Sequence, residues 1–164
     1  MQIRKIQKSD AHKYLDFLLK LDTETKSMMY EPGERPTDIS VVESIIKNAV
    51  EGENLILVAE EDENIIGFLS ALRSSPKRIH HSAYIIIGIR EAYRNLGIGK
   101  ELFSNLNIWA KENNITRLEL TVISTNEPAR KLYEKNGFEI EGIRKNSMII
   151  DGAYVDELYM AKLL

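Results

Sequence analysis

The residues from Ile87 to Lys100 have the types and the spacing of a loop that binds a phosphate group. An apolar run of β-branched residues leads into a turn that contains Gly97 and Gly99, and a helical pattern follows at once. A helix N-terminus presents unpaired N–H groups, and glycines let the backbone close around an anion. Arg94 and Lys100 would add positive charge. The stretch predicts a cradle for a diphosphate, although a strand-to-helix turn without a ligand would show the same glycines.

Two other phosphate-binding patterns do not fit this loop. A Walker A loop needs Gly-x-x-x-x-Gly-Lys-Ser/Thr, but Arg94 stands at the first glycine position and Glu101 follows the lysine. The dinucleotide fingerprint needs a third glycine, and Leu102 occupies that position. A nucleotide-binding protein of either kind is therefore disfavoured.

Two separated segments resemble the signature segments of the GNAT superfamily of N-acetyltransferases. The first is Arg94–Gly99, which is similar to that family's Arg/Gln-x-x-Gly-x-Gly/Ala pattern. The second is Asn126–Phe138, which resembles the family's Asn-x-x-Ala-x-x-Leu-Tyr-x-x-x-Gly-Phe segment. A predicted strand at 118–122 lies between them, as it does in the family. The order of predicted strands and helices is also similar from residue 2 to residue 162, so the resemblance covers nearly the whole chain.

The resemblance implies acetyl-CoA as the co-substrate. The strand that ends in Ile87–Ile89 would separate from its neighbour, so that its backbone holds the pantetheine arm and one N–H polarises the thioester carbonyl. Residues 95–100 would carry the pyrophosphate, and Asn126 would bind the arm, act as a helix N-cap, or do both. The predicted cofactor contacts are Ile87, Gly88, Ile89, Arg94, Asn95, Leu96, Gly97, Ile98, Gly99, Lys100, Asn126 and Tyr133.

Tyr133 and Glu119 are the candidate catalytic residues. Tyr133 matches the family tyrosine near the cofactor sulfur and would protonate the leaving thiolate of CoA, unless it is a core tyrosine. An amine must lose a proton before it attacks, and some relatives carry a glutamate five residues before the position of Asn126. Here that position is Thr121, so Glu119, on the same strand face, would bind the amine or act through water. The alternative for Glu119 is a half-buried charge near the end of the sheet.

The implied reaction is the transfer of an acetyl group to a primary amine by direct attack on the thioester. Segment 24–35 corresponds to the part of related proteins that walls the acceptor pocket, unless it is a solvated loop. A small amine or amino acid is the expected acceptor; the alternatives are a peptide or protein amine and a non-catalytic acyl-CoA-binding module. The predicted acceptor contacts are Glu24, Met28, Tyr30 and Glu31, which would supply negative charge and an apolar wall.

The spacing of apolar residues predicts the elements that would position these side chains. The sequence order indicates a mixed α/β fold, and the resemblance implies a mostly antiparallel, twisted sheet of about seven strands with four helices on its faces. The pair Asp151-Gly152 predicts a tight turn between the last two strands. Strands are expected at 2–7, 55–60, 65–72, 83–89, 118–123, 138–150 and 153–162, and helices after Ser9 or Asp10, after Thr37 as N-cap, and at 99–113 and 126–136.

Composition limits the class of protein further. The 164 residues carry a formal net charge of −3 and no cysteine, which disfavours a nucleic-acid partner and excludes disulfides and a cysteine nucleophile. His80 and His81 stand without clustered carboxylates, so no metal is expected. No signal-peptide or membrane-spanning run is visible, which predicts a single cytoplasmic domain over 1–164 without a membrane partner. The last strands, 138–162, offer a contact surface for a homodimer.

Overall fold

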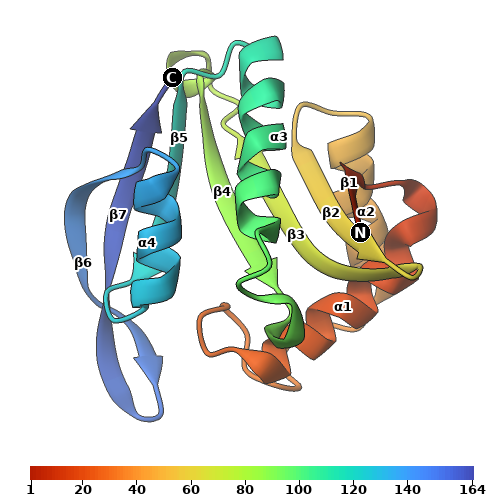
Figure 1. The fold of residues 1–164 in the computed structure, drawn as a ribbon, viewed down its shortest axis with the longest axis horizontal. Coiled ribbons are helices and arrows are strands. Elements are labelled where there is room, and N and C mark those ends of the chain that lie inside the picture. Colours follow the sequence, from red (N-terminus) through yellow and green to blue (C-terminus); the bar gives the residue numbers. More distant parts are fainter.

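One seven-stranded sheet, in the order β1-β2-β3-β4-β5-β7-β6, organises the fold (Figure 1). The computed structural model describes all residues from 1 to 164. All neighbouring strands are antiparallel except β4 and β5, so the sheet and its four helices confirm the predicted fold class. The strands are β1 (Gln2–Lys5), β2 (Leu55–Glu61), β3 (Asn64–Arg73), β4 (Ser82–Ile89), β5 (Arg117–Ile123), β6 (Glu139–Ile150) and β7 (Ala153–Leu163). The helices are α1 (Ala11–Glu24), α2 (Ile39–Val50), α3 (Ile98–Glu112) and α4 (Glu127–Lys135).

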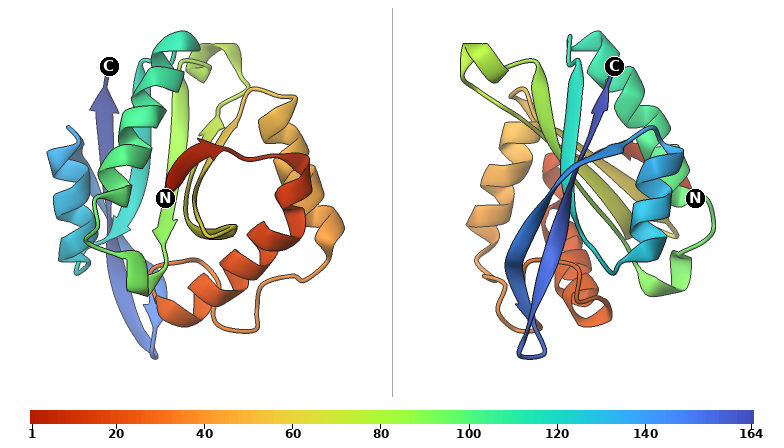
Figure 2. Two further views of the ribbon diagram at one scale, coloured as in Figure 1. Left: turned by 45° about the vertical axis from the view of Figure 1, so that its right-hand side comes forward. Right: turned by 90° about the vertical axis from the view of Figure 1, so that its left-hand side faces the viewer.

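The helices cover the two faces of the sheet in pairs, α1 and α2 on one face and α3 and α4 on the other (Figure 2). β2 shows how the sequence produces these layers. Leu55 and Leu57 belong to the core beneath α3, whereas Ile56 and Val58 belong to the core beneath α1 and α2. Because successive side chains of a strand point to opposite faces, an unbroken apolar run forms a strand that is buried on both sides. None of the helices is long and apolar enough to cross a membrane.

The parallel strands β4 and β5 pair over a short length and then separate. Their register includes only Ser82, Ala83 and Tyr84 of β4. Beyond Tyr84, β4 stays paired with β3 as far as Ile89, and β5 stays paired with β7 as far as Ile123. The two halves of the sheet therefore diverge along the second half of β4, as Figure 1 shows. This is the separation that the resemblance implied.

Local capping and turn residues explain where several elements begin. The side chain of Asp38 accepts a hydrogen bond from the backbone N–H of Ser40 at 2.9 Å, so Asp38 is the N-cap of α2. The prediction of Thr37 as this cap is wrong by one residue, because the carboxylate of Asp38 is the group that reaches the first turn. The predicted turn at Asp151-Gly152 is confirmed: φ is 51° and 78°, the positive values that a two-residue hairpin turn requires.

The strand β6 forms one edge of the sheet. Apolar side chains on β6 and β7 are exposed, among them Ile143, Ile149 and Tyr154. This surface is the one that a homodimer would use, and the homodimer stays a prediction.

Candidate functional site

The edge of β4 that faces β5 is unpaired beyond its first three residues. On the other edge, the backbone N–H of Arg90 donates to the carbonyl of Ile66 at 2.9 Å. Because backbone groups of a strand alternate in direction, those of Ile87 and Ile89 point to the side from which β5 has separated. The carbonyl of Ile89 accepts a hydrogen bond from Nε of Arg94 at 3.1 Å. Both backbone groups of Ile87 and the N–H of Ile89 therefore lack a strand partner and can pair with an extended ligand.

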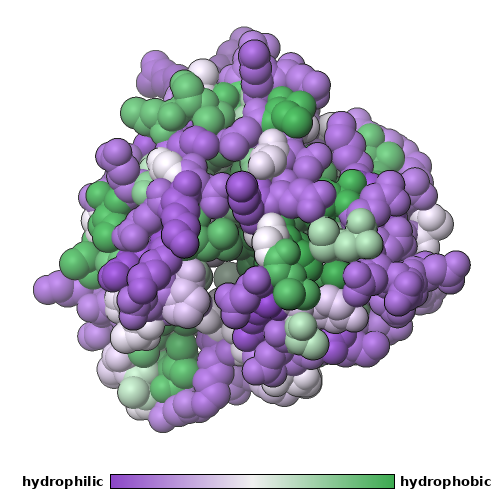
Figure 3. All heavy atoms as spheres, in the orientation of Figure 1, coloured by the Kyte–Doolittle hydropathy of each residue, from purple (hydrophilic) through white to green (hydrophobic).

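The loop between β4 and α3 forms an open cradle at the start of the helix. Asn95 and Gly97 adopt the left-handed conformation, with φ of 63° and 84°. Gly97 is the N-cap of α3, and a Cβ added there would meet no atom within 4 Å. The first helical hydrogen bond runs from the N–H of Glu101 to the carbonyl of Gly97, so the N–H groups of residues 98–100 remain available. The surface is hollowed between α4 and this end of α3 (Figure 3).

Two other glycines of the predicted cofactor contacts have a packing reason. A Cβ at Gly88 would lie 2.5 Å from Leu21 and 2.9 Å from Phe68, so this glycine lets α1 approach the sheet. A Cβ at Gly99 would lie 2.9 Å from Leu132, so this glycine lets α3 approach α4. Gly88 therefore serves the packing of α1 on one face of the sheet, and Gly99 serves the packing of α4 beside the cradle; the direct contact of either residue with a cofactor stays a prediction.

Glu24 ties the end of α1 to the loop that follows β4. Its carboxylate accepts from Nε of Arg90 at 2.8 Å and from the backbone N–H of Glu91 at 2.9 Å. Arg94 donates to the backbone carbonyl of Glu24 at 3.4 Å. Because both carboxylate oxygens are engaged within the protein, the structure favours a positioning role for Glu24 over the predicted contact with the acceptor.

Replacing Glu24 with glutamine is expected to lower the free energy of unfolding at pH 7 by about 1 kcal/mol. The hydrogen bond from Arg90 lowers the pKa of the Glu24 carboxyl below its ordinary value. Stability from such a group is fully present above the ordinary pKa and is lost as the pH falls through the lowered one. The gap between wild type and Glu24→Gln in urea titrations should therefore narrow from pH 7 to pH 3. The exposed carboxylate of Glu31 has no partner, so Glu31→Gln is the control; an equal loss there would contradict this account.

Helix α4 carries Tyr133, and Asn126 directly precedes the helix. The side-chain oxygen of Asn126 accepts from the backbone N–H of Ala129 at 3.3 Å, which confirms the N-cap, and its Nδ2 donates to Oγ of Ser27 at 3.0 Å. Tyr133 is 7% exposed and packs against the ring of Phe103 at a centroid distance of 6.0 Å. Its hydroxyl makes no hydrogen bond within the protein, and burial raises its pKa well above the ordinary value. Tyr133 is thus a core residue whose hydroxyl stays protonated and free to donate.

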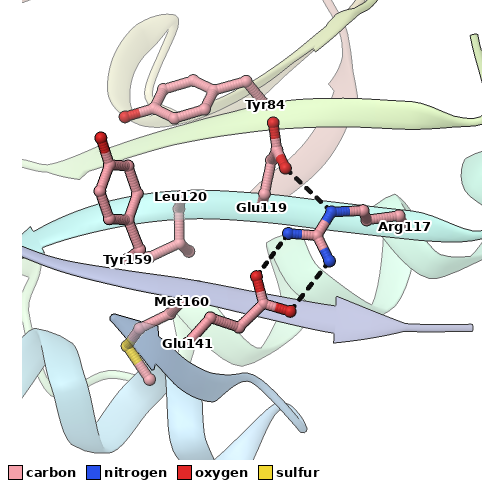
Figure 4. A pocket seen from close by; sticks show the side chains of 7 residues that line it. All are labelled: Tyr84, Arg117, Glu119, Leu120, Glu141, Tyr159 and Met160. Atoms are coloured by element: carbon pink, nitrogen blue, oxygen red, sulfur yellow. Dashed lines mark hydrogen bonds and ion pairs between the residues drawn. The ribbon is translucent and has the colours of Figure 1, made fainter. Parts of the chain in front are cut away.

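A cavity of ≈ 290 Å³ opens on the other face of the sheet, beside the point where β4 and β5 separate. Arg117 lies between two carboxylates on its wall, and its Nε donates to Glu119 at 2.9 Å (Figure 4). Its terminal nitrogens donate to Glu141 at 3.0 and 2.5 Å. The cavity is lined by Tyr84, Arg117, Glu119, Leu120, Glu141, Tyr159 and Met160.

Thr121, at the position where some relatives carry a glutamate, faces a hydroxyl partner. Its Oγ1 lies 2.7 Å from the hydroxyl oxygen of Tyr84, so a hydrogen bond spans β4 and β5. Sequence reasoning identified Glu119 but missed Tyr84, Arg117 and Glu141. Alternation along β5 places Arg117 on the face of Glu119 and could have revealed it, whereas Glu141 lies on β6, with β7 between.

The segment between α1 and α2 is anchored beside the site. Arg35 donates to the buried carboxylate of Asp22 at 2.6 and 2.9 Å, and its guanidinium lies 4.7 Å from the ring centroid of Tyr30. Met28 packs against the core beneath α1 and α2. The carboxylate of Glu31 stays exposed and unbound. The structure therefore brings Met28 and Tyr30 onto an ordered wall, and their contact with an acceptor stays a prediction.

Comparisons with known proteins agree with this geometry. The model of the acetyltransferase (GNAT) family matches residues 15–138. The L-amino acid N-acetyltransferase AaaT of Escherichia coli K12 is 35% identical over 112 residues, which are 65% of this chain and 67% of that protein. The N-alpha-acetyltransferase 50 of Danio rerio is 38% identical over 76 residues, which are 42% of this chain and 45% of that protein.

A solved structure matches the chain over almost its full length. The GNAT-family acetyltransferase of Streptococcus pneumoniae superposes with a TM-score of 0.95 at 28% sequence identity, covering 99% of this chain and 98% of that one. The family match covers most of the sheet and all of the cradle, and the solved structure extends the likeness to the last two strands. The chain therefore belongs to the GNAT superfamily of acetyl-CoA-dependent N-acetyltransferases.

Proposed function

We propose that this protein transfers the acetyl group of acetyl-CoA to the primary amine of a small amine or an amino acid. The observation that carries the proposal is the continuity of the site along β4. The unpaired edge at Ile87 and Ile89 leads directly into the cradle at Gly97, and the free hydroxyl of Tyr133 lies on the same side of the sheet. An extended ligand arm with amide groups could pair with the unpaired edge of β4, and a diphosphate at the end of that arm would lie in the open cradle.

The residues present fit acetyl-CoA. Backbone groups of Ile87 and Ile89 would hold the pantetheine arm, and the N–H groups of residues 95–100 would carry the pyrophosphate, with Arg94 and Lys100 adding charge. When bound, acetyl-CoA supplies a thioester carbonyl that an amine can attack. A fixed N–H on β4 would stabilise the negative charge that develops on the carbonyl oxygen, an effect worth about 3 kcal/mol in enzymes.

Proton transfer would use Tyr133 and Glu119. The hydroxyl of Tyr133 keeps its proton at neutral pH, as tyrosine ordinarily does, and makes no hydrogen bond within the protein, so it would protonate the leaving thiolate. On the opposite side, Glu119 is the carboxylate in register with Tyr84, where β4 and β5 separate, and it would receive the proton of the amine through water. Thr121 carries no carboxylate and therefore cannot take that role.

The size of the cavity favours a small acceptor over a protein. At ≈ 290 Å³ it is near the lower limit of ligand pockets, about 300 Å³. Among the relatives, one is named as an L-amino acid N-acetyltransferase and another as an N-alpha-acetyltransferase, so a peptide amine is the second candidate. The test is the release of CoA thiol with a panel of free amines, amino acids and short peptides. Turnover with peptides alone would make a peptide amine the first candidate acceptor in place of a small amine or amino acid. No turnover with any amine would contradict the proposal.

Replacing Tyr133 with phenylalanine is expected to lower kcat about tenfold while the affinity for acetyl-CoA stays within twofold. Proton transfer usually contributes about 100-fold or more, but a thiolate is already a good leaving group, so the loss should be smaller. Steady-state rates and calorimetric titrations with acetyl-CoA measure the two quantities. An unchanged kcat would make Tyr133 a packing residue, and an equal loss of affinity would make it a binding residue.

A further inference from the structure

A β-bulge brings Glu141 to the cavity. β6 pairs with β7 at Ile140 and again at Gly142, so Glu141 between them is an extra residue without a partner across the ladder. A bulge bends its strand and redirects the side chain of the extra residue. Here the redirected carboxylate of Glu141 reaches Arg117 on β5, although β7 lies between the two strands.

Arg117 divides its donors between two carboxylates with different geometries. Its two terminal nitrogens donate to the two oxygens of Glu141, a bidentate pair that holds the planar guanidinium in one orientation. Its Nε donates to one oxygen, Oε2, of Glu119 at 2.9 Å. Hydrogen bonds from Arg117 lower the pKa of Glu141, as expected for an ionised partner. The orientation of the Nε–H toward Glu119 therefore follows from the pair with Glu141.

The second oxygen of Glu119 remains free. Oε1 makes no hydrogen bond within the protein, and Glu119 lies opposite Tyr84, the last residue of β4 that pairs with β5. Figure 4 shows the Glu119 carboxylate between Arg117 and Tyr84. One oxygen is thus held by Arg117, and the other is presented to the cavity at the point where the strands separate.

We propose that Arg117, itself held by Glu141, is a positioning residue that keeps the Glu119 carboxylate turned toward the acceptor amine. The inference rests on the proposed function, in which Glu119 receives the proton of that amine. A carboxylate with one oxygen tied to a fixed donor gives up its rotational freedom before the acceptor arrives. A base must lie within about 3 Å of its proton, directly or through one water, so this ordering acts on the rate of transfer.

A double-mutant cycle tests whether Arg117 acts through Glu119. Arg117→Ala is expected to lower kcat about tenfold. In a Glu119→Gln background the same substitution should change kcat by less than twofold, because no base is left to position. Arg117→Lys should restore only part of the rate, because an ammonium cannot hold both carboxylates in a fixed fork. Additive losses in the double variant would overturn the proposal.

A measurement that needs no turnover separates this proposal from the acetyl transfer itself. In protein labelled with ¹³C at glutamate carboxyls, the Glu119 resonance is identified by its loss in Glu119→Gln. This resonance should move in Arg117→Ala and in Glu141→Gln. It should stay in place in the control variant Glu139→Gln, because Glu139 lies on β6, as Glu141 does, but does not line the cavity. If the Glu119 resonance keeps its position in Glu141→Gln, the proposal is overturned. The protein could also show a Glu119 resonance that moves in both variants and yet acetylate no amine. That result would support the positioning contact and refute the proposed function.

Discussion

Replacing Gly97 with tryptophan is expected to abolish the binding of acetyl-CoA, with a loss of at least about 1,000-fold, or about 4 kcal/mol. Gly97 is the N-cap of α3 with φ of 84°, a conformation that side chains rarely adopt, and the space before it is open. An indole would fill the place that the pyrophosphate needs and would turn the first N–H groups of the helix away. Calorimetric titration with acetyl-CoA measures the loss.

Two matched variants separate the filling of the cradle from backbone strain. Gly97→Asn keeps a residue type that tolerates positive φ and should retain binding within about tenfold. Gly33 has the same φ of 84° and the same open surroundings but lies in the segment between α1 and α2, so Gly33→Trp should bind acetyl-CoA like wild type. Equal losses in Gly33→Trp and Gly97→Trp would mean that general destabilisation, and not the cradle, explains the effect.

Replacing Asp22 with asparagine is expected to lower the free energy of unfolding by about 3 kcal/mol. Asp22 is 2% exposed and accepts two hydrogen bonds from Arg35, so its neutralisation leaves the half-buried guanidinium of Arg35 without its charged partner. For a protein of this size the loss corresponds to a fall of roughly 6–12 °C in the melting temperature. Urea and thermal denaturation measure both values.

The same substitution should weaken the acceptor wall. Arg35 also lies over the ring of Tyr30, so its release loosens the segment that carries Met28 and Tyr30 and raises KM for the acceptor more than KM for acetyl-CoA. Asp16→Asn, at an exposed position of the same helix, is the control and should change stability by less than about 0.5 kcal/mol. A loss below 1 kcal/mol in Asp22→Asn would show that Arg35 reaches water once its partner is neutral.

Strands and turns were predictable because their signals are local. The run at 83–89 is apolar at nearly every position and rich in β-branched residues, which is typical of a strand covered on both faces, and it forms β4. The pair Asp151-Gly152 requires positive φ at both residues and forms the last turn. The choice between Thr37 and Asp38 as a helix cap was not predictable in the same way, since both residue types cap helices and neighbouring geometry decides between them.

The roles of single side chains were harder to predict where a contact joins distant parts of the chain. From the sequence, Glu24 is predicted to be an acid that is available to a substrate. In the fold, Arg90, which is 66 residues further along the chain, donates a hydrogen bond to its carboxylate. The sequence predicts Gly88 as a cofactor contact on the strand and Gly99 as part of a phosphate loop, and the structure adds that α1 and α4 pack where their side chains would be. In each case the deciding partner comes from another element, and its distance depends on packing that no local pattern encodes.

The sequence by itself determined the family, the order of the elements and the glycine loop before α3, because these depend on residue types at fixed short spacings. Only the tertiary structure decided how the face opposite that loop is built. The bulge in β6 turns Glu141 toward Arg117, and the divergence of β4 from β5 leaves Glu119 at the start of the gap. A shift of one residue in the pairing of β6 would turn its side chains to the other face, so strand register decides which charges meet.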